Sequence, residues 1–355
     1  MSNDTGSARK IRGPKRPTIR DVSRLAGVSR MTVSRVLSEP DLVLPATRDR
    51  VRKAIADLGY VPDRTAGSLA TRRTGFIALV LPTLTNANFS MVAHGLTEVL
   101  REKDYHLLIS YTDYDLEEEE RQVTALLARR PEAILLTGAK HKRSVTRMLM
   151  MEDVPVIELA DLPSAPIQHA VGFSNHQVGR VAARHLISRG FRRIGAVASR
   201  LNHDQGDYRG EARIQGFEEE LRAHGISTEL VLRHGPAPVS YDHGAEAIGI
   251  LLDREPALEA VFAVSDLSAV GVVTECQRRG VDVPGQLSVL GFGDFEIGRV
   301  INPPLTTIQV DFHALGQRAG HLLLDLLGGN VGDEPQSIDV GLKIIDRASI
   351  RDTTE

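Results

Sequence analysis

The sequence predicts a small all-α domain at the N-terminus followed by a larger α/β body of two lobes with parallel sheets. The chain has 355 residues, which is enough for two or three domains of roughly 100–200 residues each. Apolar positions recur at helical spacing up to residue 60, and beyond residue 75 short continuous apolar runs alternate with amphipathic stretches. The charge is divided in the same way. Residues 1–75 hold 16 Lys and Arg against 7 Asp and Glu, a net charge of +9, so the other 280 residues carry −12 of the total of −3.

The composition is typical of a soluble, cytoplasmic protein. No apolar run approaches the roughly 18–20 residues of a transmembrane helix, and residues 1–17 lack the apolar segment of a secretory signal. The single cysteine, Cys276, excludes a disulfide framework and a multi-thiolate metal site. A basic N-terminal part on an acidic body indicates a nucleic-acid-binding module, although a solvated basic tail without a partner accounts for the composition equally well. We expect residues 1–16 to be a disordered basic tail.

Three short helices are expected within residues 17–62. Thr18 is placed to cap the first helix with Asp21 completing a capping box, and Ser29 and Thr47 are placed to cap the second and third. Two helices joined by a Gly-containing turn form a helix-turn-helix unit, whose second helix can present its N-terminal side chains to the DNA major groove. A three-helix module for protein contact has the same pattern, but the many basic side chains of this segment favour DNA.

From residue 76 onward the pattern is that of a parallel α/β protein. The continuous apolar runs lie at 76–81, 106–110, 133–136, 155–159, 194–198, 260–264 and 287–292. Helical stretches between these runs predict parallel sheets with helices on both faces. About 280 residues are better accommodated by two lobes than by one. Small ligands bind beyond the C-terminal ends of such strands, so the cleft between the lobes is the expected ligand site.

The sequence carries no signature of catalysis or of a cofactor. No Walker loop is present, and after Gly291 and Gly293 the next glycine, Gly298, lies too far along for a dinucleotide loop. There is no HExxH, no GxSxG, and no cluster of histidines and carboxylates at metal-ligand spacing. We therefore expect a protein that is not an enzyme and that needs no cofactor or metal.

The segments TIRDVSRLAGVSRMTVSRVLSEP (18–40) and TRDRVRKAIADLGYVPD (47–63) closely resemble the headpiece of the LacI/GalR-type transcriptional regulators. Later segments resemble those of the same family and occur in the same order, among them IALVLPTLTNANF (77–89), RIQGF (213–217) and PPLTTIQVDFHALGQRA (303–319). Within the family the chain is most similar to the gluconate-operon repressors, through PVIELAD (155–161), VGFSN (171–175) and GFGDFEIG (291–298). The resemblance covers almost the whole chain.

The resemblance implies a homodimer whose effector body is periplasmic-binding-protein-like. A hinge helix or linker is expected at 63–74, followed by an effector-binding and dimerisation domain at 75–350. One lobe is expected at about 76–172 plus 312–330, and the other at about 173–309 plus 331–350.

In the DNA-binding module, the resemblance puts Arg30, Met31 and Arg35 at base edges, where an arginine can fork to the O6 and N7 atoms of a guanine. The candidates for phosphate contacts, which fix the register without reading sequence, are Thr18, Ser29, Thr32 and Ser34. Capping is the alternative role of Thr18 and Ser29, and both roles can coexist. Residues 64–71 match the hinge helix, which implies that Leu69 wedges into the minor groove; an exposed linker residue is the alternative.

The effector cleft is expected to bind an anion. The resemblance puts Arg213 at the family's ligand-binding arginine, and Arg209 lies four residues earlier on the same helical face. Two guanidinium groups converging there can hold a carboxylate. The alternative is that both are surface arginines paired with Glu211 or Glu218.

A departure from the family's pattern also favours an anionic ligand. Many sugar-binding members carry Asp directly after the aromatic residue of a Gly-aromatic-Asp motif, whereas this chain has Gly293 there, followed by Asp294. The loss of a carboxylate that would accept hydrogen bonds from sugar hydroxyls suits a ligand that is itself anionic. Gluconate, or a related aldonate or ketoaldonate, is therefore the expected effector. Glu158 and Asp266 are expected to accept hydrogen bonds from its hydroxyl groups. The remaining candidates for this site are Asn86, Asn88, Phe89, Asp294 and Phe312.

The sequence thus predicts a DNA-binding repressor of a sugar-acid catabolic operon, released from a palindromic operator by a small anionic effector. The alternative is a pleiotropic regulator of carbon metabolism whose co-effector strengthens DNA binding. A two-lobed solute-binding receptor is disfavoured by the basic headpiece and the missing signal peptide, and a sugar-processing enzyme by the missing catalytic constellation. The C-terminal segment lacks the apolar heptads of a tetramerising helix, so a dimer is favoured.

Overall fold

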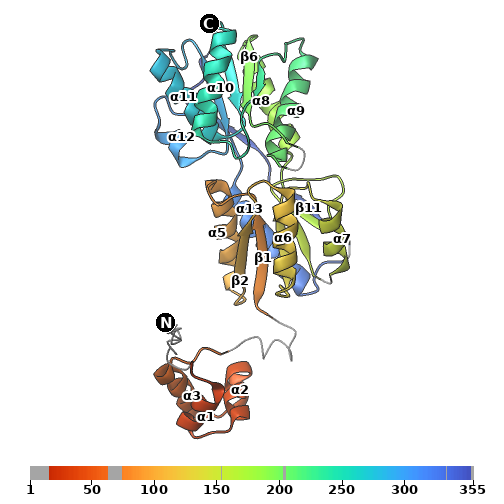
Figure 1. Cartoon of the computed structure of the whole chain (residues 1–355), viewed down its shortest axis with the longest axis vertical. Coiled ribbons are helices and arrows are strands. Elements are labelled where there is room, and N and C mark those ends of the chain that lie inside the picture. The colour runs from red at the N-terminus through yellow and green to blue at the C-terminus, as the bar shows by residue number, and fades with distance from the viewer. Residues whose placement is uncertain (1–15, 63–73, 153, 203–204, 333, 353–355) are drawn as a thin grey trace, which may run out of the picture. The chain divides into compact units, whose positions relative to one another are not determined.

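The computed structural model (Figure 1) describes residues 16–62, 74–152, 154–202, 205–332 and 334–352. The chain divides into two compact units, Met1–Thr74 and Gly75–Glu355, and each is described by itself. The predicted class is confirmed, because a helical N-terminal unit precedes a two-lobed α/β unit. Over the described ranges, no helix combines the length and the apolarity that crossing a membrane requires.

The N-terminal unit packs short helices around a small apolar core. Its elements are α1 (Ile19–Ala26), α2 (Arg30–Ser38), the 3-10 helix η1 (Pro40–Leu42) and α3 (Pro45–Leu58). Its buried side chains are Val22, Ala26, Val33, Val36, Val51 and Ala54. The turn between α1 and α2 passes through Gly27, whose φ of 63° is the left-handed conformation that glycine adopts at little steric cost.

The predicted helix starts are confirmed for α1 and α2 and are wrong for α3. The backbone N–H and the hydroxyl of Thr18 donate to the Asp21 carboxylate at 3.0 and 2.7 Å. The Ser29 Oγ accepts from the backbone N–H three residues on, at 3.0 Å. The third helix instead begins at Pro45, so Thr47 lies inside its first turn. Proline is favoured at the first helical position because its φ is already helical and the N–H that it lacks would have no partner there.

The first lobe of the second unit is a parallel sheet in the order β11-β5-β4-β3-β1-β2. Its strands are β1 (Phe76–Leu81), β2 (His106–Tyr111), β3 (Ala133–Thr137), β4 (Val156–Leu159), β5 (His169–Gly172) and β11 (Ser337–Asp339). Its helices are α5 (Ala87–Arg101), α6 (Leu116–Leu127), α7 (Arg143–Met151) and α13 (Phe312–Leu327). Helices α5 and α13 cover one face, where Leu96 and Leu315 are buried, and α6 and α7 cover the other, where Val123 and Val145 are buried.

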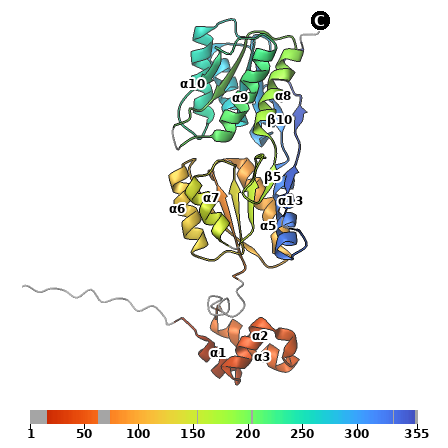
Figure 2. The same cartoon turned by 90° about the vertical axis from the view of Figure 1, so that its right-hand side faces the viewer.

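The second lobe is a sheet in the order β12-β10-β9-β8-β6-β7, with β12 antiparallel to β10 and the other pairs parallel. Its strands are β6 (Ile194–Ala198), β7 (Val231–Arg233), β8 (Ala260–Ala263), β9 (Ser288–Phe292), β10 (Thr306–Gln309) and β12 (Lys343–Ile345). Its helices are α8 (Asn175–Ser188), α9 (Tyr208–Ala223), α10 (Tyr241–Arg254), α11 (Asp266–Arg279) and α12 (Glu296–Val300). Figures 1 and 2 show the helices on both faces of each sheet.

The chain passes between the lobes three times: from β5 to α8, from β10 to α13, and from β11 to β12. The sequence assigned residues 331–350 to the second lobe, and this is wrong for β11. Ile338 lies opposite Val171 of β5, so residues 337–339 extend the first sheet. This edge strand has three residues with only a half-buried centre, so it carries no continuous apolar run to mark it.

Three helix pairs of the second unit pack backbone against backbone at glycines. At the α8–α9 crossing, a Cβ on Gly179 would lie 1.7 Å from the carbonyl oxygen of Arg213, and a Cβ on Gly216 would lie 2.0 Å from that of His176. The α5–α13 and α10–α11 crossings have the same reciprocal arrangement, through Gly95 with Gly316 and Gly244 with Gly271. Since no side chain fits at these points, each crossing fixes the distance and register between its two helices.

Replacing Gly179 by alanine is expected to destabilise the chain. Alanine has the better helix propensity, by about 1 kcal/mol, but its Cβ would have to displace backbone rather than a flexible side chain. Overpacking of this kind costs about 1–3 kcal/mol, and a backbone clash belongs at the upper end of that range. Urea denaturation followed by circular dichroism measures the change. Gly332→Ala is the control, because a Cβ there meets nothing within 4 Å; equal stability of the two variants would contradict the steric argument.

Candidate functional site

Helix α2 presents a basic and polar face to solvent. Arg30, Met31, Ser34 and Arg35 are all exposed, Met31 to 72%, whereas Val33 is fully buried. The spacing i, i+1, i+4, i+5 puts the four exposed side chains on one side of the helix. Neither arginine has an ion-pair partner among the residues that the structure describes. Both guanidinium groups are therefore free to meet an external acceptor.

Hydroxyl groups gather at the starts of α1 and α2. Thr18 is exposed at the N-terminus of α1, and the Ser29 Oγ lies 2.9 Å from the Thr32 Oγ1 at the N-terminus of α2. Helix N-termini carry partial positive charge and free N–H groups, which favour phosphate. The structure thus gives Thr18 and Ser29 their capping role and leaves phosphate contact as a prediction. Leu69, the predicted minor-groove wedge, lies outside the described residues.

In the second unit a cavity lies between the two lobes, beyond the C-terminal ends of strands of both sheets. The space between its walls, including the part that is open to solvent, is about 550 Å³. Six of the predicted effector residues line it: Asn86, Asn88, Phe89, Arg209, Arg213 and Phe312. Asn86 caps α5 by accepting from the backbone N–H of Asn88 at 3.0 Å. Because Asn86, Asn88 and Phe89 line the cavity, the start of this helix faces it.

Arg213 is buried in the cavity wall, with 6% of its surface exposed. Its Nε donates to the Asn175 side-chain oxygen at 3.2 Å, and its Nη1 donates to the Val264 carbonyl at 2.5 Å. The guanidinium carbon lies 4.2 Å from the centroid of the Phe292 ring. Burial lowers the pKa of Arg213; the negative charge of Asp207 opposes this shift, and the positive charge of Arg209 adds to it. Its neutral partners orient the guanidinium without neutralising it.

Arg209 lies one turn earlier on α9 and reaches across to the first lobe. Its Nη1 donates to the Thr137 carbonyl at 3.2 Å, and its guanidinium lies 5.3 Å from the centroid of the Phe89 ring. The alternative pairing of these arginines with the glutamates of α9 is wrong, because Arg233 forms those ion pairs. Its guanidinium contacts Glu211 and Glu218 at 2.8 and 2.9 Å.

The cavity has an excess of positive charge. Its charged lining side chains, within the described ranges, are Arg209, Arg213 and Asp207. The Asp207 Oδ1 is buried and lies 3.9 Å from the Arg209 Nη2. It has no hydrogen-bond partner among the residues that the structure describes. Tyr114 also lines the cavity, and burial raises the pKa of its phenol above the usual range, so it stays neutral. A small molecule with a carboxylate and hydroxyl groups matches this wall.

Glu158 is not in the cavity, which corrects the sequence-based expectation. It is buried within the first lobe, where its Oε2 accepts from the Ile167 N–H at 2.6 Å and its Oε1 lies 3.6 Å from the Nε2 of His141. Glu119 contacts the other nitrogen of that ring at 2.8 Å. Burial alone would lower the pKa of His141, but the two carboxylates outweigh it and raise that pKa to about 9. Glu158 therefore belongs to a buried ion-pair cluster.

Asp266 and Asp294 are also held by the protein itself rather than turned to the cavity. The oxygens of Asp266 accept from the Thr307 hydroxyl at 2.7 Å and the Phe295 N–H at 2.8 Å. Burial raises the pKa of Asp266 to about 6. Asp294 accepts from Arg299 at 2.8 Å and is also paired with Arg347 and Gln309. Both carboxylates join the end of β9 to its surroundings, so their expected contact with the effector is wrong.

Sequence reasoning missed several cavity residues. Asp207, Tyr114, Phe173 and Phe292 line the wall. Asp207 stands two residues before Arg209, so the charged segment that it shares with the arginines was an available signal. Tyr114 gave none, because its position depends on a left-handed backbone with φ of 63°.

Two protein-family models match the chain. The one described as bacterial regulatory proteins, lacI family, matches residues 18–63, which contain the helices of the N-terminal unit. The one described as a periplasmic binding protein-like domain matches residues 183–350.

Relatives and solved structures match nearly the whole chain. The HTH-type transcriptional regulator GntR of Pseudomonas aeruginosa is 34% identical over 346 residues, which cover 97% of this chain and 99% of that protein. A transcriptional regulator of the LacI family from Silicibacter pomeroyi has a similar structure, with a TM-score of 0.87, 31% identity and coverage of 94% of this chain and 100% of that one. The lac repressor dimer bound to operator and the anti-inducer ONPF gives a TM-score of 0.80, 25% identity and coverage of 94% and 99%.

Replacing Asp266 by asparagine is expected to change how stability depends on pH. In the folded chain the pKa of Asp266 is about 6, above the value of about 3.9 in an unfolded chain. Between these values the folded state holds a proton that the unfolded state has lost, so stability from this group is complete below about pH 4 and falls as the pH rises through about 6.

Since asparagine does not titrate, the free energy of unfolding of Asp266→Asn relative to the unsubstituted chain should rise between pH 4 and 7. The expected rise is on the order of 3 kcal/mol, from a shift of about 2 pH units. Urea titrations of both proteins at each pH measure it. A difference that stays constant over this range would show that Asp266 is ionised in the folded state throughout.

Proposed function

The chain belongs to the lacI family of bacterial regulatory proteins, and on this basis we propose that it represses a sugar-acid catabolic operon by binding a palindromic operator as a homodimer. In this proposal a small anionic effector of the gluconate type, held between the lobes, releases it from the DNA. Family membership makes the chain a DNA-binding transcriptional regulator and not an enzyme. The pair of buried arginines in the cavity is the observation that carries the choice of an anionic effector.

The exposed face of α2 supports the proposed mode of DNA binding. Arg30 and Arg35 project from it without ion-pair partners among the described residues, so each can fork to a guanine in the major groove. Met31 offers an apolar contact beside them, suited to a thymine methyl group. Hydroxyl groups at the starts of α1 and α2 supply phosphate contacts that fix the register.

The hinge segment completes the proposed interface with DNA. Residues 64–71, which include Leu69, would form a hinge helix on the operator, pair with the same segment of the dimer mate, and insert Leu69 into the minor groove. The resemblance of this segment to the family supports the assignment, as does the similarity of the chain to the operator-bound lac repressor dimer.

The geometry of the arginines favours a carboxylate as the group that is recognised. Arg213 is held by Asn175 and by a backbone carbonyl, and Arg209 approaches from one turn away. A carboxylate with its two oxygens shared between the guanidinium groups forms charge-assisted, directional hydrogen bonds. It also offsets the excess of one positive charge in the wall. A neutral sugar would leave that charge uncompensated.

Polar groups in the same wall suit the hydroxyl groups of such a ligand. The unpartnered Asp207 oxygen can accept from a hydroxyl, which is the role that the sequence assigned to Glu158 and Asp266. Asn88 supplies a side-chain amide from the first lobe, and Phe89 and Phe312 supply apolar surface for the carbon chain. A polyhydroxylated acid would use the arginines, the polar groups and the apolar surface together.

Contacts between the lobes give the effector a way to alter the dimer. Besides the bond from Arg209 to Thr137, the Gly206 N–H donates to the Tyr114 carbonyl at 2.9 Å, and Asp115 forms a bridge with Gln205. A ligand that contacts both walls changes the equilibrium between lobe arrangements. In the proposed mechanism this change separates the paired hinge segments and removes the minor-groove contacts.

Gluconate is expected to dissociate the complex of the unsubstituted chain with a palindromic operator from its own promoter region, as measured by fluorescence anisotropy. Arg213→Lys keeps the charge but loses the fork, and should raise the gluconate concentration needed for half-dissociation at least tenfold. Arg209→Gln should act in the same direction.

Arg222→Ala is the matched control for this experiment. Arg222 lies on the same helix, but its side chain is 56% exposed and pairs only with Glu218 among described residues. A wild-type response in the Arg213 variant would contradict the proposed site. Strengthening of the DNA complex by gluconate would favour the alternative, a regulator whose co-effector promotes binding.

Arg30→Ala and Arg35→Ala are each expected to weaken operator binding and to relax its sequence preference. The loss of one arginine fork to guanine costs about 1–3 kcal/mol of discrimination. Anisotropy with the operator and with single-base variants, at fixed salt, measures both effects. Ser38→Ala on the same helix is the control, since its hydroxyl bonds to the Ser34 carbonyl within α2. Equal losses on operator and on scrambled DNA would assign the arginines to phosphate instead.

A further inference from the structure

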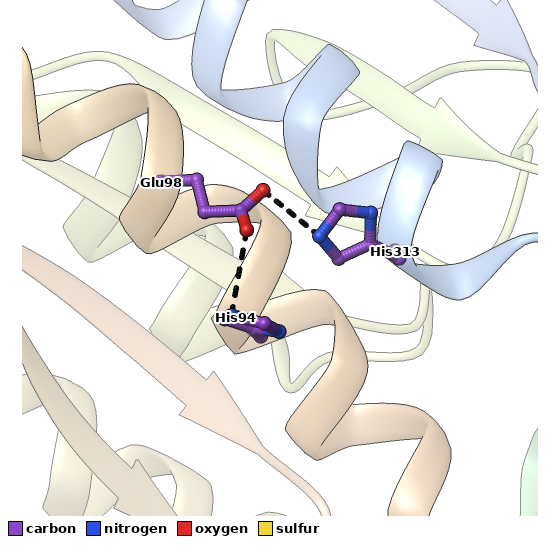
Figure 3. A group of neighbouring side chains, drawn as sticks. All are labelled: His94, Glu98 and His313. Atoms are coloured by element: carbon purple, nitrogen blue, oxygen red, sulfur yellow. Dashed lines mark ion pairs between the residues drawn. The ribbon is translucent and has the colours of Figure 1, made fainter.

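Two histidines and a glutamate meet on the first lobe, outside the lining of the effector cavity (Figure 3). His94 and Glu98 stand one turn apart on α5, and His313 is the second residue of α13. The His94 Nε2 lies 3.4 Å from one Glu98 oxygen, and the His313 Nε2 lies 2.9 Å from the other. All three ligand atoms lie within 4.8 Å of one another.

The backbone holds these side chains together. At the α5–α13 crossing a Cβ on Gly95 would lie 2.2 Å from the carbonyl oxygen of His313, and a Cβ on Gly316 would lie 2.2 Å from that of Val92. The residue next to His94 therefore touches the backbone of His313 directly. This contact fixes the distance between the two helices at the point where the three side chains project.

The spacing of the ligand atoms suits a tetrahedral metal ion. Zinc binds imidazole nitrogen and carboxylate oxygen at about 2.0–2.2 Å, which puts neighbouring ligand atoms about 3.3 Å apart. Each imidazole nitrogen lies near this distance from one of the two Glu98 oxygens. The three ligand atoms, one from each residue, lie within 4.8 Å of one another, so side-chain rotations would have to bring them together around one ion. Two imidazoles and a carboxylate form a ligand set that zinc takes with a fourth position open to water.

The surroundings of the carboxylate also fit a metal ligand. The Gln317 side chain donates to a Glu98 oxygen at 3.1 Å and orients the carboxylate, as residues behind a metal ligand commonly do. Across the described part of the chain, no Lys or Arg pairs with Glu98, so no fixed cation competes for the position between the histidines. The side chains of His94 and Glu98 are 68% and 42% exposed, which leaves the site open to an ion from solvent.

We propose that His94, Glu98 and His313 form a binding site for a zinc ion, completed by water. The ion cross-links α5 to α13. Both helices begin at the effector cavity, α5 with Asn88 and Phe89 and α13 with Phe312. Zinc at this site therefore braces the part of the first lobe that supplies one wall of the cavity.

Isothermal titration of the full-length chain with zinc tests this site directly. The unsubstituted chain is expected to bind one zinc ion per chain with higher affinity than it binds any further zinc. His94→Ala, Glu98→Gln and His313→Ala should each weaken the binding of that ion at least tenfold. His176→Ala is the matched control, because His176 also pairs with one exposed glutamate, Glu219 at 2.9 Å, but no third ligand joins this pair within the described ranges.

Thermal unfolding provides a second readout. Zinc should raise the unfolding temperature of the unsubstituted chain and of His176→Ala, and should leave that of the three site variants unchanged. Circular dichroism without zinc checks that every variant is folded. Absence of a tight equivalent in the unsubstituted chain would overturn the proposal. So would its persistence in the His94 and His313 variants.

Discussion

The close approach of helix pairs at glycines is the constraint on which two groups of side chains in the second unit depend: the arginines of the cavity, and the cluster of His94, Glu98 and His313. At the α8–α9 crossing, Gly179 lies against the backbone of Arg213, and Asn175 at the start of α8 accepts a hydrogen bond from that arginine. At the α5–α13 crossing, Gly95 lies against the backbone of His313, and His94 and Glu98 flank that glycine on α5. In each case the missing Cβ lets side chains of two helices meet within bonding distance.

Most of the central strands could be predicted because parallel strands buried on both faces form continuous apolar runs. The runs at 76–81, 194–198 and 287–292 agree with β1, β6 and β9 to within one residue. The three-residue strands β7, β11 and β12 were missed because they lie at the edges of their sheets and their residues are half-buried or exposed, so no apolar run marks them. The interior strands β5 and β10 were also missed, because His169 in the first and Thr306 and Thr307 in the second interrupt the apolar pattern although these residues are buried. Pairing with a distant strand, rather than local sequence, makes these segments extended.

The arginines of the cavity could be predicted, whereas its carboxylates could not. The resemblance to the family put Arg213 at the ligand-binding position, and a spacing of four residues put Arg209 on the same helix face. Asp266 required finer placement, because its neighbours Ser265 and Leu267 line the cavity while Asp266 itself turns to Thr307. Consecutive residues at a helix start point about 100° apart, so an error of one position moves a side chain from the ligand to the core.

The electrostatics of the cavity relate anion binding to closure of the lobes. Burying a guanidinium costs free energy unless its charge is compensated, and the hydrogen-bond acceptors of Arg213 are neutral. Arg209 adds a second positive charge nearby, and Asp207 supplies the single carboxylate among the described lining residues. The contact from Arg209 to Thr137 joins the lobes. The charged side chains among the described lining residues, Arg209, Arg213 and Asp207, carry a net charge of +1 in this arrangement. An anion removes that cost in the closed arrangement more than in an open one, where water solvates the arginines. In the proposed mechanism, an anionic effector therefore stabilises closure of the lobes.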